Sequence, residues 1–142
     1  MKQTLITIHS DGGARGNPGP AAYGFVITDS ERNIVFQEGQ CIGIATNNVA
    51  EYTGVVKSLE WVVDHITGLT SIEIILDSEL IARQMTGIYK VKNEQLRNYY
   101  LRIKRLEQTI GVQIRYTSAP RNQNKDADRL VNLALDTQAK SS

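Results

Sequence analysis

The stretch "ITIHSDGGARGNPGPAAYGFVI", residues 6–27, decides how the fold of this chain begins. Apolar and polar residues alternate up to Asp11, as they do in a β-strand with one buried face. Glycines and prolines follow, and the chain then returns to an apolar run. The pattern predicts a strand that ends at a single carboxylate, then a loop of small and rigid residues, then a second strand.

The remainder of the chain changes from strands joined by short turns to alternating helices and strands. The spacing of apolar residues predicts strands over residues 3–10, 22–28, 34–42, 71–76 and 111–117. It predicts helices over residues 46–65, 78–85, 93–110 and 125–138, with a frayed tail after them. This order is typical of an α/β fold with a five-stranded mixed sheet. We expect antiparallel hairpins among the first three strands, and parallel first, fourth and fifth strands because helices separate them.

The composition is that of one domain spanning residues 1–142, with an ordered core of about residues 2–138. Hydrophobic residues make up 41% of the chain, which is enough to bury a core. A single cysteine, Cys41, excludes an internal disulfide framework and suits a reducing compartment. No segment has the length of a signal peptide or a membrane span. We expect a cytoplasmic monomer with no membrane partner, while the net charge of +1 indicates no class of partner.

Four acidic residues share a position at the end of a predicted strand or near the start of a predicted helix: Asp11, Glu51, Asp77 and Asp128. Each also has an ordinary structural explanation. Asp11 suits a turn, Asp77 suits a helix N-cap, and the other two acids suit the helix dipole. Because their strands are predicted to be parallel neighbours, Asp11 and Asp77 should lie at one edge of the sheet, where such folds bind ligands.

Convergence of the four acids would require a positive charge, because like charges at close range cannot all stay ionised. Oxygen ligands without nearby histidine or cysteine favour Mg²⁺, with Mn²⁺ as a substitute. Two such ions about 4 Å apart can stabilise the attacking and leaving oxygens of a phosphodiester. The acids therefore predict a metal-dependent enzyme that cleaves phosphodiester bonds.

Four blocks of sequence carry a recognisable pattern: "TIHSDGGARGNPGPAAYGFVI", "ATNNVAEYTGVVKSLEW", "IILDSELIARQM" and "NKDADRLVNLAL". In this order, and over nearly the whole chain, they resemble the blocks of type 1 ribonuclease H. The resemblance implies the ribonuclease H-like fold and an endonuclease that cuts the RNA strand of RNA–DNA hybrids with Mg²⁺, leaving 3′-hydroxyl and 5′-phosphate ends. It leaves open an activity on double-stranded RNA, or a domain that binds hybrids without cutting them.

The same resemblance implies roles for particular residues. It identifies the metal-binding, catalytic carboxylates as Asp11, Glu51, Asp77 and Asp128. Asp126 is the competitor for the fourth place. It identifies the substrate contacts as Gly12, Gly13, Asn17 and Asn47. Asn48 is expected to brace the loop. The two glycines would let the main chain approach a sugar–phosphate backbone, and turn or cap chemistry is the alternative for the asparagines.

Two departures from the better-known bacterial members change the expectations. The loop "SAPRNQNKDAD" has no histidine, so Arg121 is expected to join the catalytic residues by binding a phosphate. The loop "GIYKVKNEQ" stands where those members have a long basic protrusion, as in short-form archaeal and some bacterial relatives. Substrate affinity is then expected from the cations of residues 83–105, for which a solvated helix face is the alternative.

Overall fold

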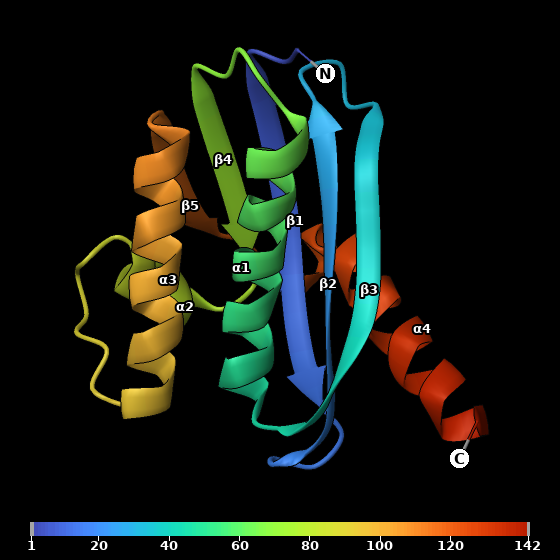
Figure 1. Cartoon of the computed structure of the whole chain (residues 1–142). Coiled ribbons are helices and arrows are strands. Elements are labelled where there is room, and N and C mark those ends of the chain that lie inside the picture. The colour runs from blue at the N-terminus through green and yellow to red at the C-terminus, as the bar shows by residue number, and fades with distance from the viewer. Residues whose placement is uncertain (1, 142) are drawn as a thin grey trace.

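A five-stranded mixed sheet forms the middle of the computed structural model, which describes residues 2–141 (Figure 1). The strands are β1 (Leu5–Ala14), β2 (Gly19–Asp29), β3 (Ile34–Ala45), β4 (Ser71–Leu76) and β5 (Gln113–Ser118). The helices are α1 (Asn47–His65), α2 (Glu79–Met85), α3 (Glu94–Ile110) and α4 (Lys125–Ser141), with a 3₁₀ turn at Arg121–Gln123. Every predicted strand and helix is present in the predicted order.

The strand order across the sheet is β3-β2-β1-β4-β5. β1 is antiparallel to β2 and β2 to β3, whereas β4 is parallel to both β1 and β5. The parallel pairs follow from the connections, because α1 joins β3 to β4 while α2 and α3 join β4 to β5. The α/β class, the mixed sheet and the strand directions expected from the sequence are confirmed.

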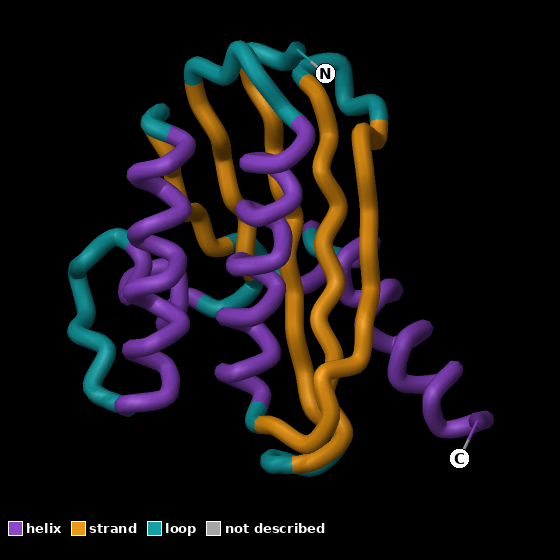
Figure 2. Tube along the Cα trace, in the orientation of Figure 1, coloured by secondary structure: helices purple, strands orange, loops and turns teal. Residues whose placement is uncertain are grey.

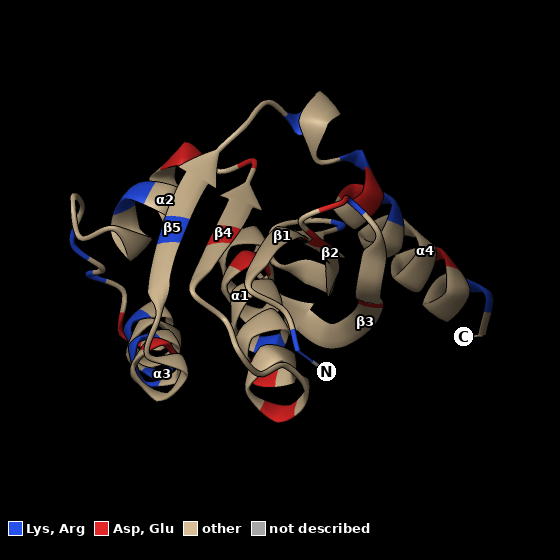
Figure 3. Ribbon diagram, turned by 90° about the horizontal axis from the view of Figure 1, so that it is seen from above, with Lys and Arg blue, Asp and Glu red and all other residues tan. Residues whose placement is uncertain are grey.

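The helices cover the two faces of the sheet unequally (Figures 1 and 3). α1 packs on β1 and β2, and α3 packs beside α1 on the same face. α4 lies on the opposite face, against β3, β2 and β1. The main hydrophobic core lies between the sheet and α1, with Phe25, Tyr52 and Leu59 among its fully buried side chains. This packing places the first turns of α1 and α4 near the central strand from opposite sides.

Several element boundaries differ from the sequence-based prediction. β1 runs to Ala14 instead of residue 10, and β2 begins at Gly19. The ladder between them includes these glycines because backbone pairing does not need the alternating side chains that mark a strand in sequence. Asp11 therefore lies inside β1, not at its end. α4 continues to Ser141, so the tail expected to fray is helical through that residue.

Side-chain caps begin three of the helices. Thr46, Ser78 and Asn93 each accept a hydrogen bond from the backbone N–H three residues further on, at the starts of α1, α2 and α3. α1 ends before Ile66, whose backbone is extended. Gly68 lies in the turn that follows, with a φ of 78°.

The loop of residues 86–93, between α2 and α3, lies at the side of the molecule away from α4 (Figure 2). It is short, and the two helices that it joins are the crossover from β4 to β5. No helix within residues 2–141 has the length and apolar character needed to cross a membrane.

Candidate active site

Asp11 and Asp77 meet at the edge of the sheet where β4 ends. β1 pairs with β4 as far as His9 opposite Ile75, whereas its pairing with β2 continues past Asp11. Asp77 is the first residue after β4. The two acids therefore lie at the carboxyl end of the same parallel pair, which is where open α/β sheets bind ligands.

A glycine contact brings Glu51 to this edge. A β-carbon on Gly12 would lie 2.2 Å from the carbonyl carbon of Ala50 and 2.4 Å from the backbone nitrogen of Glu51. α1 therefore rests on the main chain of β1, and a larger residue would push it away. This contact gives Gly12 a structural reason besides the approach to nucleic acid that the family resemblance implies. Gly13 does have open space, because the atom nearest to a β-carbon there, Asn47 Oδ1, would be 3.9 Å away.

Asp11, Glu51 and Asp77 form a three-carboxylate cluster, in which one oxygen of each residue lies within 4.8 Å of the others. Asp11 is 5% exposed and Glu51 is 7% exposed. Oε2 of Glu51 is buried and has no hydrogen-bond partner within residues 2–141. A buried carboxylate oxygen without a donor is costly unless a proton or a cation neutralises it.

Burial and repulsion weaken the acidity of this cluster. Burial, followed by the charges of Asp77 and Asp128, raises the pKa of Asp11 from 3.8 to about 7. Burial also raises the pKa of Glu51 well above its usual range, and the neighbouring acids add to this effect. A divalent cation would relieve both penalties. The donors are all oxygens, so the residues present fit a hard cation such as Mg²⁺ or Mn²⁺.

Asp77 is not the N-cap of α2. Ser78 has that role, because its Oγ accepts a hydrogen bond from the backbone N–H of Ile81 at 3.2 Å. Asp77 Oδ2 instead accepts a hydrogen bond from Nε of Arg121 at 3.4 Å. The ordinary structural explanation for Asp77 is therefore wrong, and its carboxylate belongs to the cluster.

Arg121 lies in the 3₁₀ turn before α4, with its guanidinium beside the cluster. The Arg121 side chain is 79% exposed and that of Asp77 is 8% exposed, so the arginine approaches the cluster from solvent. Within residues 2–141, the hydrogen-bond partner of its guanidinium is Asp77. A phosphate group arriving from solvent would meet this guanidinium at the open side of the cluster.

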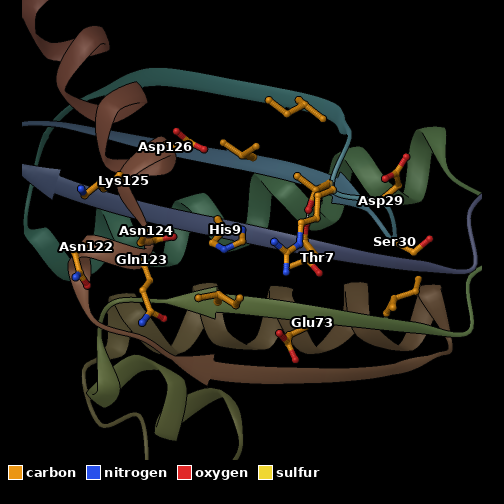
Figure 4. Close-up of a pocket in the computed structure, with 16 residues that line it drawn as sticks. Thr7, His9, Asp29, Ser30, Glu73, Asn122, Gln123, Asn124, Lys125 and Asp126 are labelled. Carbon is orange, nitrogen blue, oxygen red and sulfur yellow. Dashed lines mark hydrogen bonds between the residues drawn. The ribbon is translucent and has the colours of Figure 1, made fainter.

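The first turn of α4 presents its two acids to different neighbours. Asp128 lies close enough to Asp11 to raise the pKa of that carboxyl group. Asp126 lines a cavity of about 770 Å³ on the α4 side of the sheet, together with His9 (Figure 4). Burial lowers the pKa of His9, and the charge of Asp126 opposes this shift. Asp128, not Asp126, is thus the neighbour of the three-carboxylate cluster, although it lies outside the 4.8 Å group.

Asn17 and Asn47 connect the loop after β1 to the start of α1. Asn17 Oδ1 accepts a hydrogen bond from the backbone N–H of Asn47 at 2.9 Å, and Asn47 Oδ1 accepts one from Ala14 at 2.8 Å. Asn48, which the sequence suggests as the brace, is exposed and makes no such side-chain bond within residues 2–141. The brace is therefore made by the two asparagines that were expected to contact substrate.

Cations of residues 83–105 lie along α2, α3 and the loop between them (Figure 3). Three of them form ion pairs: Arg83 with Glu79, Arg102 with Glu60, and Lys104 with Glu107. Within residues 2–141, the cations of this segment without an ion pair are Lys90, Lys92, Arg97 and Arg105. This unpaired set is what remains available to an anionic partner.

The sequence did not single out Asn124 and Gly24, which contact the residues next to Asp11 and Asp128. Asn124 is 1% exposed, and its Nδ2 donates to the Ser10 carbonyl at 2.9 Å. Gly24 lies opposite Asp11 in the β1–β2 ladder. Asn124 stands inside the "NKDAD" block, which is a local signal, but the position of Gly24 becomes visible only with the strand register.

The strand order, the helices on both faces and the acids around the central strands define the class of this protein as a ribonuclease H-like domain. Residues 9–134 match the family described as reverse transcriptase-like. The bifunctional protein Rv2228c of Mycobacterium tuberculosis is 42% identical over 137 residues, which make up 96% of this chain and 37% of that protein. Ribonuclease HI of Halobacterium salinarum is 40% identical over 131 residues, 92% of this chain and 64% of that enzyme.

Solved structures of ribonuclease H proteins have the same fold as this chain. The N-terminal ribonuclease H domain of Rv2228c has a TM-score of 0.90 at 40% identity, covering 98% of this chain and 99% of that one. LC11-RNase H1, solved in complex with an RNA/DNA hybrid, has a TM-score of 0.87 at 40% identity, covering 94% and 99%. The chain belongs to the type 1 ribonuclease H family, as a short form in which residues 86–93 alone join α2 to α3. It spans 37% of the length of Rv2228c.

Proposed function

We propose that this chain is a metal-dependent endoribonuclease that hydrolyses the RNA strand of RNA–DNA hybrids and leaves 3′-hydroxyl and 5′-phosphate ends. The observation that carries the proposal is the buried three-carboxylate cluster, in which Glu51 keeps an oxygen without a partner. The complex of LC11-RNase H1 with an RNA/DNA hybrid supports the choice of substrate.

Asp11, Glu51, Asp77 and Asp128 are the residues that would hold the metal, which we take to be Mg²⁺ with Mn²⁺ as a substitute. When bound, divalent cations supply positive charge where negative charge develops during phosphodiester hydrolysis. The carboxyl groups act as ligands only when ionised, so Asp11 and Glu51 must release the protons that burial favours. Their burial also limits screening by water, which strengthens the interaction with a cation.

Arg121 would bind a phosphate oxygen of the RNA strand. A guanidinium stays charged at any working pH, so it does not act as a general base. It can instead bind phosphate through two parallel N–H donors, which fixes orientation as well as charge. Its exposed position beside Asp77 supports this role, because an incoming phosphate can compete for the same guanidinium.

Gly13, Asn17 and Asn47 would contact the nucleic acid from the other side of the cluster, with Gly12 shaping the strand beneath them. The Oδ1 atoms of the two asparagines already accept backbone hydrogen bonds. Their side-chain NH₂ groups have no partner within residues 2–141, and they can donate to sugar or base oxygens. Donors directed at 2′-hydroxyls are what distinguishes an RNA strand from a DNA strand.

The proposal is tested by exposing an RNA–DNA hybrid, a double-stranded RNA and a DNA duplex of one sequence to the protein, with and without Mg²⁺. We expect cleavage of the hybrid, in its RNA strand and only with metal. A DNA duplex containing a short run of ribonucleotides should be cut only within that run. Equal cutting of the all-DNA duplex would exclude the proposal, and binding of the hybrid without cleavage would identify a silent binding module. Cleavage of double-stranded RNA would widen the substrate range.

A further inference from the structure

α4 rests directly on the backbone of two strands. A β-carbon on Gly24 would lie 2.6 Å from the Ala127 carbonyl oxygen and 2.9 Å from Cβ of Leu130. A β-carbon on Gly39, in the neighbouring strand, would lie 2.7 Å from the Leu130 carbonyl oxygen. Real β-carbons do not come this close to backbone atoms, so the helix reaches this depth only because both positions are glycine.

The contact at Gly24 lies at the level of the carboxylate cluster. In the β1–β2 ladder Gly24 is the direct partner of Asp11. On the helix side, the atom that touches it belongs to Ala127, the residue before Asp128. The depth of α4 at this point therefore decides how near Asp128 comes to Asp11.

Asn124 provides a second connection between the same two acids. Its side chain is buried and donates to the carbonyl of Ser10, the residue before Asp11. The main-chain carbonyl oxygen of Asn124 accepts a hydrogen bond from the backbone N–H of Asp128 at 3.1 Å. One residue thus links the backbone next to Asp11 with the backbone of Asp128, and burial shields the side-chain bond from competing water.

The other polar connections of α4 lie further along the helix. Arg15 pairs with Asp136 at 2.5 Å, but both side chains are substantially exposed, at 44% and 57%. Cys41 donates its thiol hydrogen to the Ala134 carbonyl at 3.2 Å. Neither contact lies within the first turn of α4, so the connections nearest to Asp128 are the contact at Gly24 and the hydrogen bond of Asn124.

We propose that Gly24 and Asn124 are positioning residues that set the distance between Asp128 and Asp11, and so let the fourth carboxylate join the metal site. The inference rests on the proposed function, because it assigns Asp128 a share in binding the metal. It adds that this share depends on how closely α4 packs on the sheet. Gly24 and Asn124 determine that packing without being ligands of the metal or contacts of the substrate.

The test places Asn124→Ala in the parent chain and in the Asp128→Asn variant. Each protein is measured for kcat and KM on a hybrid, for Mn²⁺ binding by calorimetry without substrate, and for melting temperature. In the parent we expect kcat to fall about ten- to a hundredfold with KM within about twofold, on the scale of a misplaced catalytic group. Mn²⁺ binding should weaken as well. In the Asp128→Asn background the same change should alter kcat and Mn²⁺ binding by less than about twofold.

Melting temperature separates this role from a merely structural one. Loss of the buried hydrogen bond should lower it by the same amount in both backgrounds, because that loss does not depend on Asp128. Gly24→Ala should repeat the pattern of kcat and Mn²⁺ binding. Asn122→Ala, an exposed neighbour in the same turn, is the matched control and should leave all the measurements unchanged.

An equal loss of kcat in both backgrounds, or unchanged Mn²⁺ binding in the parent carrying Asn124→Ala, would overturn the inference. The proposed function fails separately, if the parent does not cut the hybrid at all. In that case the calorimetric comparison still decides the inference, since it needs no substrate.

Discussion

The carboxylate of Asp77 lies between two kinds of neighbour, the acids of the cluster and the guanidinium of Arg121. The arginine is mostly exposed, and an exposed ion pair contributes little to stability. At the scale of single residues, Asp77 therefore adds repulsion to Asp11 and Glu51 when no metal is bound.

Replacing Asp77 with Asn should separate catalysis from stability. Cleavage of a hybrid should fall by several orders of magnitude, because a metal ligand is lost while the shape is kept. In EDTA, the melting temperature should stay the same or rise, since the change removes a charge that raises the pKa of Asp11 and Glu51. Asp64→Asn, at an exposed acid of α1, is the control and should change neither measurement. Near-normal cleavage, or a clear loss of stability in EDTA, contradicts a shared metal site.

Replacing Arg121 with Ala should slow turnover by about ten- to a thousandfold, the scale of losing one well-placed electrostatic contact. Lys at this position should restore activity only in part, because it supplies charge without the planar fork. Mn²⁺ binding measured by calorimetry should persist, because no carboxylate is removed. If Arg121 merely pairs with Asp77, turnover of the Ala variant would stay within about twofold of the parent.

At the scale of elements, contact between α1 and β1 decides where Glu51 lies. Gly12→Ala should force the helix away from the strand and destabilise the fold by about 1–3 kcal/mol, the usual range for overpacking. Cleavage should fall too, because the displaced helix carries Glu51. Chemical denaturation and initial rates on a hybrid are the measurements.

Gly13→Ala is the matched control for that prediction. Its β-carbon would have no atom nearer than 3.9 Å, so the free energy of unfolding should stay within about 0.5 kcal/mol of the parent. Equal destabilisation by the two substitutions would show that the loss of stability does not come from the contact of Gly12 with α1.

At the scale of the whole molecule, the cluster links stability to pH. The pKa of Asp11 is about 7 in the folded protein and close to 3.8 when unfolded, so the folded state binds more protons between these values. Stability without metal should therefore be greatest at low pH within this window and should fall as pH rises from about 4 to about 7. In EDTA, the melting temperature should drop by several degrees between about pH 5 and about pH 8.

Two comparisons test this origin of the pH dependence. Asp11→Asn should make the curve less steep, because one of the two titrating groups with a raised pKa is gone while Glu51 remains. Added Mg²⁺ should raise the melting temperature most at the higher pH, where the ligands are ionised. A curve that is flat in EDTA for the parent would show that the cluster does not carry the predicted repulsion.

The sequence by itself predicted the α/β class, the five strands, the four helices and their order, because these depend on apolar periodicity and on local cap and turn residues. It also predicted which acids to examine, since Asp77 and Asp128 stand beside element ends that can be located in one dimension. What it could not supply were the contacts between distant segments. Asn124 and Ser10, 114 positions apart, are joined by one hydrogen bond that no local pattern encodes.

The tertiary structure alone decided several points at the site. It showed that α1 can pack on β1 only because residue 12 is glycine. It also showed that Asn47, not Asn48, braces the loop after β1. Finally, it placed Asp128, not Asp126, beside Asp11. The physical reason is the same in each case. Asp126 and Asp128 are two positions apart on one helix and look alike in sequence, and only the depth and rotation of α4 on the sheet decide which carboxylate meets β1.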